Sequence, residues 1–159
     1  MRKEGLLDFL ESLFFFTNKR IKIHPFSLHQ YAEVINLWLR AGLQLSRSDT
    51  FEGLRQKLER DPELFLVATT EAGNIVGAVM GSYDGRRGWV NHLAVDPGYQ
   101  GQDLGSRLMQ ELEHRLAALG CEKINLLIEP SNSGVQAFYG RLGFTADELI
   151  FMEKWMKPA

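Results

Sequence analysis

The residues best suited to chemistry begin in the segment Leu93–Gly105, LAVDPGYQGQDLG. An apolar run ends at Val95, an Asp-Pro-Gly turn follows, and two glycines lead into leucines at helical spacing. Glycine lets a ligand approach the backbone closely, and the first turn of a helix offers unpaired N–H groups and a partial positive charge. The segment therefore predicts an anion site. It has neither the Lys-Ser/Thr pair of a Walker loop nor the Gly-x-Gly-x-x-Gly of a dinucleotide fingerprint.

In a second segment, SNSGVQAFYGRLGF, Asn132 stands 27 positions after Gly105. We expect one helix here, from Ser131 or Asn132 through Leu142, with Asn132 as its cap. Asn132 and Tyr139 are seven positions apart and would then share one helix face. The two segments together predict a ligand site with a phenol in it.

These pieces resemble the GNAT superfamily of N-acetyltransferases, which use acetyl-coenzyme A. The matching pieces are the strand ending Ala94-Val95-Asp96-Pro97, the Gln/Arg-x-x-Gly-x-Gly/Ala loop at Gln100–Gly105, and the Asn…Phe-Tyr…Leu-Gly-Phe segment ending at Phe144. The resemblance extends from about Arg20 to Trp155. It implies an α/β GNAT fold: a single mixed, mostly antiparallel sheet with a central parallel pair of splayed strands, and helices on both faces.

The resemblance also implies roles. The pantetheine arm would pair with the backbone of Leu93 and Val95, and an N–H near Leu93 would face the thioester oxygen. The diphosphate would lie on the N–H groups of residues 100–106. The residues implied in acetyl-coenzyme A binding are Leu93, Ala94, Val95, Gln100, Gly101, Gln102, Asp103, Leu104, Gly105, Ser106, Asn132 and Tyr139. Arg107 and Arg141 could reach the phosphates or lie on the solvated surface.

Tyr139 is the residue we expect to be the general acid, because the departing thiolate needs a proton. The general base stays open. Relatives that acetylate ribosomal protein N-termini have a Glu where this chain has Leu127. The remaining candidates are Glu129, Asn91 through a bound water, and His92; strand alternation favours a buried position for His92 instead.

One position departs from the family pattern, because Asp103 stands where the loop normally has Gly. Its carboxylate could cap the following helix, repel the diphosphate, or point to solvent and leave only backbone at the ligand. We favour the solvent orientation, since Asp tolerates unusual backbone conformations.

The rest of the chain predicts the elements that position these residues. Antiparallel strands are expected first, then a helical crossover to a parallel strand. The expected strands are Arg20–His24, Leu64–Thr70, Ile75–Tyr83, Trp89–Val95, Ile124–Ile128 and Leu149–Trp155; the expected helices are Leu28–Leu43, one from Asp49 or Thr50 to before Pro62, and one carrying Leu104 to Leu119 with Gly120 as its cap.

Composition bounds the function. The chain has 159 residues, 45% of them hydrophobic, and a formal charge of −2, so no overall field would draw it to nucleic acid or a membrane. A single cysteine, Cys121, fits a reducing cytoplasm and excludes a multi-cysteine zinc site. No metal is expected. We expect a helical extension over residues 1–18 and one acetyltransferase domain over residues 19–159.

The extension reads as an amphipathic helix over Leu6–Phe16, far shorter than the ~20 apolar residues that span a bilayer. Its phenylalanines would form an exposed patch unless the domain or a second copy, in a homodimer, covers them. These are Phe9, Phe14, Phe15 and Phe16.

The leading function is acetyl transfer from acetyl-coenzyme A to a primary amine, of a small molecule or of a protein N-terminus or lysine, by direct attack in a ternary complex. The acceptor would meet the loops Gln44–Ser48 and Tyr83–Gly88. The alternative is a catalytically weak acyl-coenzyme A binding or sensor module, motivated by Asp103 and the unassigned base. The third hypothesis is an interaction protein that binds its partner through the N-terminal helix.

Overall fold

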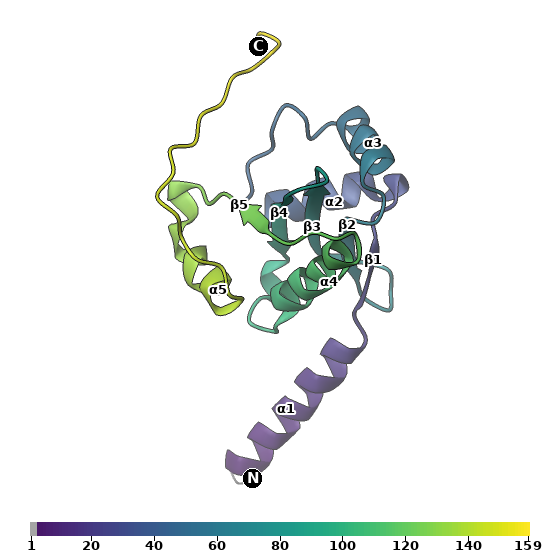
Figure 1. Ribbon diagram of the computed structural model, residues 1–159. Coiled ribbons are helices and arrows are strands. Elements are labelled where there is room, and N and C mark those ends of the chain that lie inside the picture. The colour runs from purple at the N-terminus through teal and green to yellow at the C-terminus, as the bar shows by residue number, and fades with distance from the viewer. Residues whose placement is uncertain (1–2) are drawn as a thin grey trace. The chain divides into compact units, whose positions relative to one another are not determined.

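The computed structural model describes residues 3–159, except for the side chains of residues 3–4 and 14–19. The chain forms two compact units, residues 1–127 and residues 128–159. The first holds α1 (Lys3–Lys19), β1 (Lys22–Pro25), α2 (Tyr31–Arg40), α3 (Phe51–Arg60), β2 (Phe65–Thr69), β3 (Ile75–Tyr83), β4 (Gly88–Val95), α4 (Leu104–Ala118) and β5 (Ile124–Leu126); the second holds α5 (Gln136–Arg141), and Figure 1 labels them.

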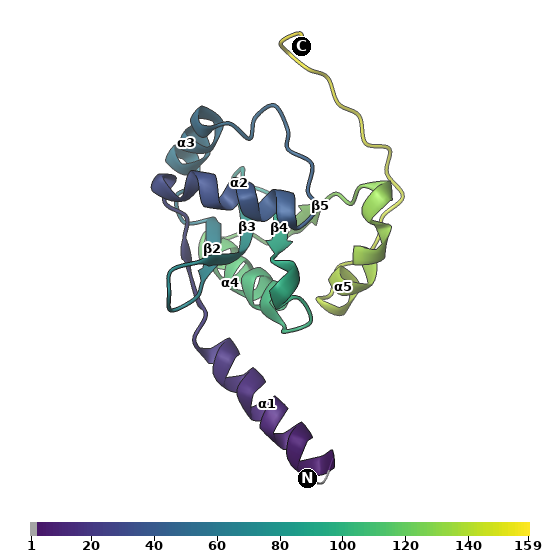
Figure 2. The same ribbon diagram turned by 180° about the vertical axis from the view of Figure 1, so that it is seen from behind.

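The first unit is built on one sheet with the strand order β1-β2-β3-β4-β5. The first three neighbour pairs are antiparallel and β4 pairs with β5 in parallel. Helix α4 lies on one face of the sheet and α2 on the other, as the two opposite views show (Figures 1 and 2). The mixed α/β fold class is confirmed, and the parallel pair lies at the end of this sheet and not inside it.

Glycines on β3 let α4 lie close to the sheet. A Cβ on Gly77 would lie 2.9 Å from Leu108 Cδ1, and one on Gly81 would lie 2.4 Å from Leu112 Cδ1. Those leucines are fully buried. Gly77 and Gly81 therefore mark close packing of α4 on β3.

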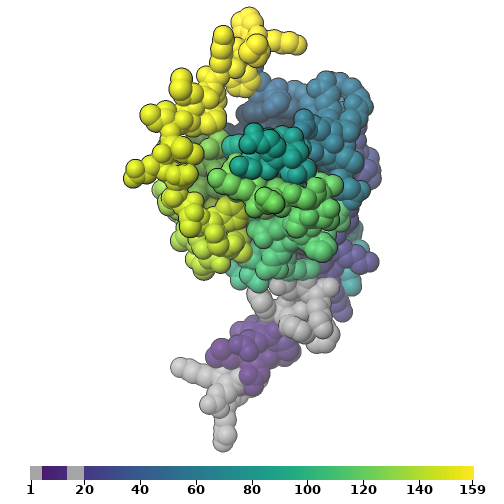
Figure 3. Space-filling model, in the orientation of Figure 1, coloured from purple at the N-terminus to yellow at the C-terminus, as the bar shows by residue number. Residues whose placement is uncertain are grey.

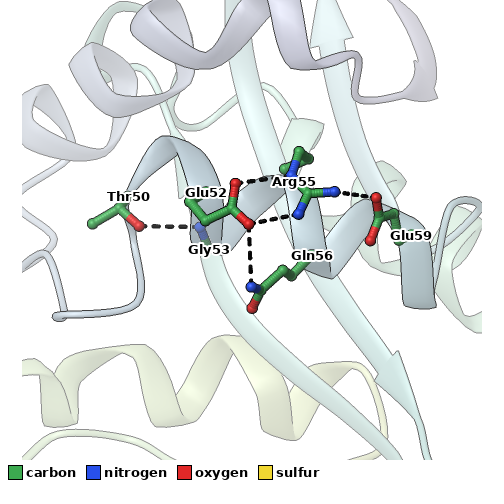
Figure 4. A network of polar contacts seen from close by, with 6 residues as sticks. All are labelled: Thr50, Glu52, Gly53, Arg55, Gln56 and Glu59. Carbon is green, nitrogen blue, oxygen red and sulfur yellow. Dashed lines mark hydrogen bonds and ion pairs between the residues drawn. The ribbon is translucent and has the colours of Figure 1, made fainter.

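The ends of the helices follow the capping residues in the sequence. Gly120 has φ 88° and its N–H donates to Ala117 O at 2.9 Å, while Cys121 N–H donates to Leu116 O at 3.1 Å, which ends α4 in a Schellman motif. Thr50 caps α3, since its Oγ1 accepts from Gly53 N–H at 3.0 Å. Figure 4 shows this cap and the ion pairs of Arg55 with Glu52 and Glu59 along the exposed face.

Helix α1 confirms the expected N-terminal helix and is longer than predicted. Five of its apolar side chains, those of Leu6, Leu7, Phe9, Leu10 and Leu13, are 45–60% exposed. The side chains of Phe14, Phe15 and Phe16 lie outside the described residues. Over the part of the chain that the structure describes, no helix is long and apolar enough to cross a bilayer.

The second unit corrects two expectations. The helix does not run from Asn132 to Leu142: a 3-10 segment covers Pro130–Val135, Asn132 has φ −115°, and α5 begins only at Gln136. The sequence Pro-Ser-Asn-Ser-Gly favours turns over helix, because Ser and Asn bond to nearby backbone and Gly loses most entropy in a helix. The side chain of Asn132 therefore does not cap α5.

The second correction concerns Leu149–Trp155, which is not a strand. This segment is yellow in Figure 3, and its large apolar side chains from Leu149 to Met156 are 57–91% exposed. A strand needs the backbone of a neighbour for its hydrogen bonds, and residues 128–159 contain no other strand.

Candidate functional site

The parallel strands β4 and β5 pair over only three residues each. Gly88, Trp89 and Val90 pair with residues 124–126, and the pairing stops there. Beyond it, β4 continues to Val95 along β3 alone. One edge of β4 is therefore without a strand neighbour, among the described residues, over its second half.

The hydrogen bonds between β4 and β3 indicate which main-chain N–H and C=O groups of β4 face its open edge. Asp96 N–H donates to Val76 O at 2.8 Å, toward the β3 side. Because successive residues of an antiparallel strand direct their N–H and C=O groups to alternate sides, those of Val95 point away from β3, and Leu93, which lies in the bulge described below, has no partner in the β3 register. Val95 O accepts there from Gln100 Nε2 at 3.2 Å. The edge thus presents main-chain groups at the two positions where an extended ligand was expected to pair.

A bulge explains why β4 leaves β5. Asn91 is paired with Met80 and Ala94 with Ala78, so two residues of β4, His92 and Leu93, lie opposite one residue of β3. His92 has φ 50°, a left-handed conformation that costs free energy in a residue with a side chain. A bulge bends its strand and increases the twist, which separates β4 from a straight neighbour. Simple alternation along Trp89–Val95 misses this insertion.

The loop after β4 is shaped by a carboxylate and by left-handed residues. Asp96 Oδ1 accepts from Gly98 N–H at 2.9 Å, and its Oδ2 meets Arg40 Nη2 at 3.0 Å. Gly101 has φ 75° and Asp103 has φ 64°. The loop therefore turns sharply just before α4.

The start of α4 offers unpaired N–H groups. Arg107 N–H makes the first bond of the helix, to Asp103 O at 3.1 Å, so residues 104–106 have no carbonyl partner within it. Asp103 is exposed, and its side chain makes no capping hydrogen bond. The capping alternative is thus excluded, and the helix N-terminus keeps its donors for an anion.

A histidine and a buried carboxylate meet beside the bulge. His92 Nε2 lies 3.1 Å from Asp49 Oδ1 and 3.0 Å from Asp49 Oδ2, and the His92 ring packs on Trp38 with 4.7 Å between centroids. Asp49 precedes α3, and only 5% of its side chain is exposed, against 24% for His92. The expectation that His92 is buried in the core is wrong in part: the ring lies at the edge of the core and is held by a charge.

Asp49 is the residue that the sequence did not single out. It reads as a helix start, but Thr50 makes the cap, which leaves the carboxylate of Asp49 for other partners. Burial opposes the charged form, yet hydrogen bonds from His92 and from Ser46 N–H, at 2.6 Å, outweigh it and lower the pKa of Asp49. The signal in the sequence was that two residues able to cap α3, Asp49 and Thr50, are neighbours, so that one of them is left for another role.

Tyr139 lies on α5 in the second unit and is nearly buried. Its ring meets Phe138 and Phe144 edge to face, at centroid distances of 5.1 and 5.7 Å. Burial raises the pKa of the Tyr139 phenol, so the group stays protonated around neutral pH.

The other expected residues fall in varied settings. Arg107 donates from Nη2 to Ile21 O at 2.9 Å, and so ties α4 to the start of β1. Asn91 and Glu129 are exposed, and Leu127 is exposed where relatives have a Glu. No group of three or more His, Cys, Asp or Glu residues that could hold a metal occurs in the described part of the chain.

Comparisons with known proteins give a consistent result. Residues 29–144 match the acetyltransferase (GNAT) family. Acetyltransferase SG1711 of Sodalis glossinidius is 38% identical over 132 residues, which cover 83% of this chain and 92% of that protein. The crystal structure of Ard1 from Thermoplasma volcanium has a TM-score of 0.71 at 24% identity and covers 79% of this chain and 83% of its own.

A chain of the NatC complex bound to Gag peptide and CoA is similar to the same degree. Its TM-score is 0.70 at 24% identity, over 81% of this chain and 87% of that one. Both structural matches are distant in sequence and show the fold.

Proposed function

Because this chain belongs to the GNAT family of acetyltransferases, we propose that it moves the acetyl group of acetyl-coenzyme A to a primary amine by direct attack in a ternary complex. The observation that carries this proposal is the open edge of β4, where Leu93 and Val95 present main-chain groups without a strand neighbour. Such an edge accepts an extended amide-containing chain as it would accept a strand.

The two ends of the co-substrate find different partners. The pantetheine arm would pair with Leu93 and Val95, with Ala94 between them facing the core. The Leu93 N–H would stabilise the thioester oxygen as negative charge develops, an effect of about 10²–10³ in rate for one such donor. The diphosphate would lie on the backbone of residues 100–106, next to the free N–H groups that begin α4.

Tyr139 would supply the proton that the leaving thiolate takes. Its buried phenol stays protonated at neutral pH, as an acid must before the transfer. Asn132 does not cap a helix, so we assign its amide to the pantetheine arm.

The acceptor amine would enter between the loops 44–48 and 83–88. In the second loop Asp84 Oδ1 holds the turn by accepting from the N–H groups of Arg86 and Arg87, at 2.8 and 2.7 Å. The guanidinium of the exposed Arg86 would favour an acceptor that carries an acidic group, whether a small molecule or a peptide.

One observation supports a second candidate, an acyl-coenzyme A binding module with weak turnover. The exposed carboxylate of Asp103 stands at the mouth of the diphosphate loop, where like charge weakens phosphate binding. A module of this kind would bind the co-substrate and release little or no thiol.

An assay of thiol release separates the two. Purified protein with saturating acetyl-coenzyme A is mixed with a panel of primary amines, including lysine peptides and peptides with free N-termini, and free thiol is followed over time. Amine-dependent thiol and an acetylated product by mass spectrometry support transfer. Thermal stabilisation by acetyl-coenzyme A with no thiol from any amine supports the binding module.

We propose further that residues 1–18 are an extension of a domain spanning residues 19–159, and that the protein acts in the cytoplasm. The half-exposed apolar face of α1 would then be a contact between two copies in a homodimer. Deleting residues 2–18 and measuring the mass in solution tests the contact: a dimer that persists without α1 contradicts it.

A further inference from the structure

The bulge places an ionisable side chain one residue from the expected thioester site. His92 directly precedes Leu93, so their Cα atoms are about 3.8 Å apart. Its ring lies on the α2 face of the sheet against Trp38, and its partner Asp49 directly follows the loop 44–48 that was expected to contact the acceptor. The ring thus joins the strand that would hold the acetyl group to the loop that would hold the amine.

The geometry of the His92–Asp49 pair determines which nitrogen of the imidazole carries the proton. Asp49 is held in place by Ser46 N–H at 2.6 Å and stays ionised, because its hydrogen bonds outweigh the effect of burial and lower its pKa. A carboxylate only accepts, so the nitrogen that faces it, His92 Nε2, carries the proton. Nδ1 is then the basic nitrogen, and its lone pair is free to take a proton.

We propose that His92 is the general base of acetyl transfer and that Asp49 is its positioning residue. This inference rests on the transferase function proposed above. The alternatives are weaker in chemistry: the Asn91 amide is not basic, and the Glu129 side chain is exposed to water.

The step balances as follows. The amine nitrogen forms a bond to the acetyl carbon and loses one proton to His92 Nδ1, the C–S bond breaks, and the thiolate takes one proton from Tyr139. His92 then gives its proton to water and Tyr139 regains one, so the net change moves a single proton from nitrogen to sulfur.

The strained backbone of His92 fits this role. A left-handed conformation at a non-glycine residue persists where surrounding contacts hold it, and such residues cluster at functional sites. Here the contacts are the Asp49 carboxylate and the face of Trp38.

The test compares His92→Gln with a matched control, His24→Gln, in steady-state acetyl transfer to the best acceptor found. His24 is also half-buried and bonded through Nε2, to Thr69 Oγ1 at 3.1 Å, but lies on β1. We expect kcat to fall about 100-fold or more in His92→Gln, with acetyl-coenzyme A affinity by calorimetry unchanged, and no change in kcat for His24→Gln. Asp49→Asn should lower kcat at least tenfold, because the His92 ring then loses the group that orients it.

The pH dependence separates a base from a structural role. Without the base, the amine loses its proton to water, so the deficit of His92→Gln should shrink between pH 7 and pH 9. The charged group that faces the His92 ring is Asp49. The other neighbours are uncharged: Trp38 of α2, Val79 of β3 opposite the bulge, and the leucines of α4 on the other face of the sheet.

Three results would overturn the inference. They are a wild-type kcat in His92→Gln, a deficit that stays constant with pH, and, should that variant not fold, a titration of the wild-type His92 ring by NMR that does not match the inflection of kcat/KM. Each of them leaves wild-type transfer intact and so spares the proposed function. If the wild type releases no amine-dependent thiol, that result contradicts both the proposed function and the role of His92.

Discussion

The phenol of Tyr139 is the group whose loss should affect chemistry most and binding least. Tyr139→Phe keeps the ring and its contacts with Phe138 and Phe144 but removes the proton donor. We expect kcat to fall about 10²–10⁴-fold with little change in KM for acetyl-coenzyme A. Steady-state kinetics measure both, and a kcat near that of the wild type would remove Tyr139 from the mechanism.

Asp103 should weaken the binding of a diphosphate by its charge. Its backbone, at φ 64°, suits glycine, so Asp103→Gly keeps the loop and removes the carboxylate. We expect tighter binding of acetyl-coenzyme A, by up to about tenfold, because the side chain is exposed and screened by salt.

Asp103→Asn is the matched control, since asparagine also tolerates this conformation. Calorimetry on both variants should give similar gains if charge is the cause. Unchanged or weaker affinity in Asp103→Gly would refute the repulsion.

The carboxylate of Asp49 should make stability depend on acid. Its pKa in the folded protein is lowered, so the unfolded chain takes up the proton first, near pH 4. The ionised Asp49 carboxylate therefore makes its full contribution to the free energy of unfolding above that pH. This contribution is lost as the pH falls through the pKa that Asp49 has in the folded protein.

Asp49→Asn should therefore be less stable at pH 7 and lose less stability on acidification than the wild type. Urea unfolding between pH 3 and pH 7 measures the free energy of unfolding of both. Two parallel curves would show that the ionisation of Asp49 adds nothing.

At the scale of elements, α3 is joined to β3 by a buried lysine. Lys57 Nζ donates to Asp61 Oδ2 at 2.5 Å, to Ser82 Oγ at 2.8 Å and to Gly81 O. The two charged side chains are only 13% and 7% exposed. Burial lowers the pKa of Lys57, and the ion pair with Asp61 partly offsets it.

Lys57→Met should cost about 3 kcal/mol, because it leaves a buried carboxylate with its main partner removed. Arg55→Met is the control on the same helix: its ion pairs are exposed and should contribute little (Figure 4). Urea unfolding at pH 7 compares them, and equal losses would contradict the importance of burial.

Local patterns predicted most elements, and their failures have local causes. Gly120 and Thr50 are short-range signals, and each ends or begins a helix as expected. The bulge at His92 is invisible to a period of two, because it depends on register against β3. Asp49 meets His92 across 43 positions, a contact that no spacing rule predicts.

At the scale of the molecule, the proposed reaction draws on both units. The β4 edge, the start of α4 and the His92–Asp49 pair belong to residues 1–127, while Tyr139 and Asn132 belong to residues 128–159. The family match, residues 29–144, runs through both. Transfer should therefore need the whole matched region, whereas the diphosphate loop and its helix lie in the first unit.

The most direct test is amide exchange followed by NMR, with and without acetyl-coenzyme A. If the thioester arm pairs with the open edge of β4, exchange should slow at the amides of Leu93 and Val95 and across residues 100–106. It should change little on β1, at the far edge of the sheet. Saturating acetyl-coenzyme A that leaves the Leu93 and Val95 amides exchanging at their free rates would contradict the account.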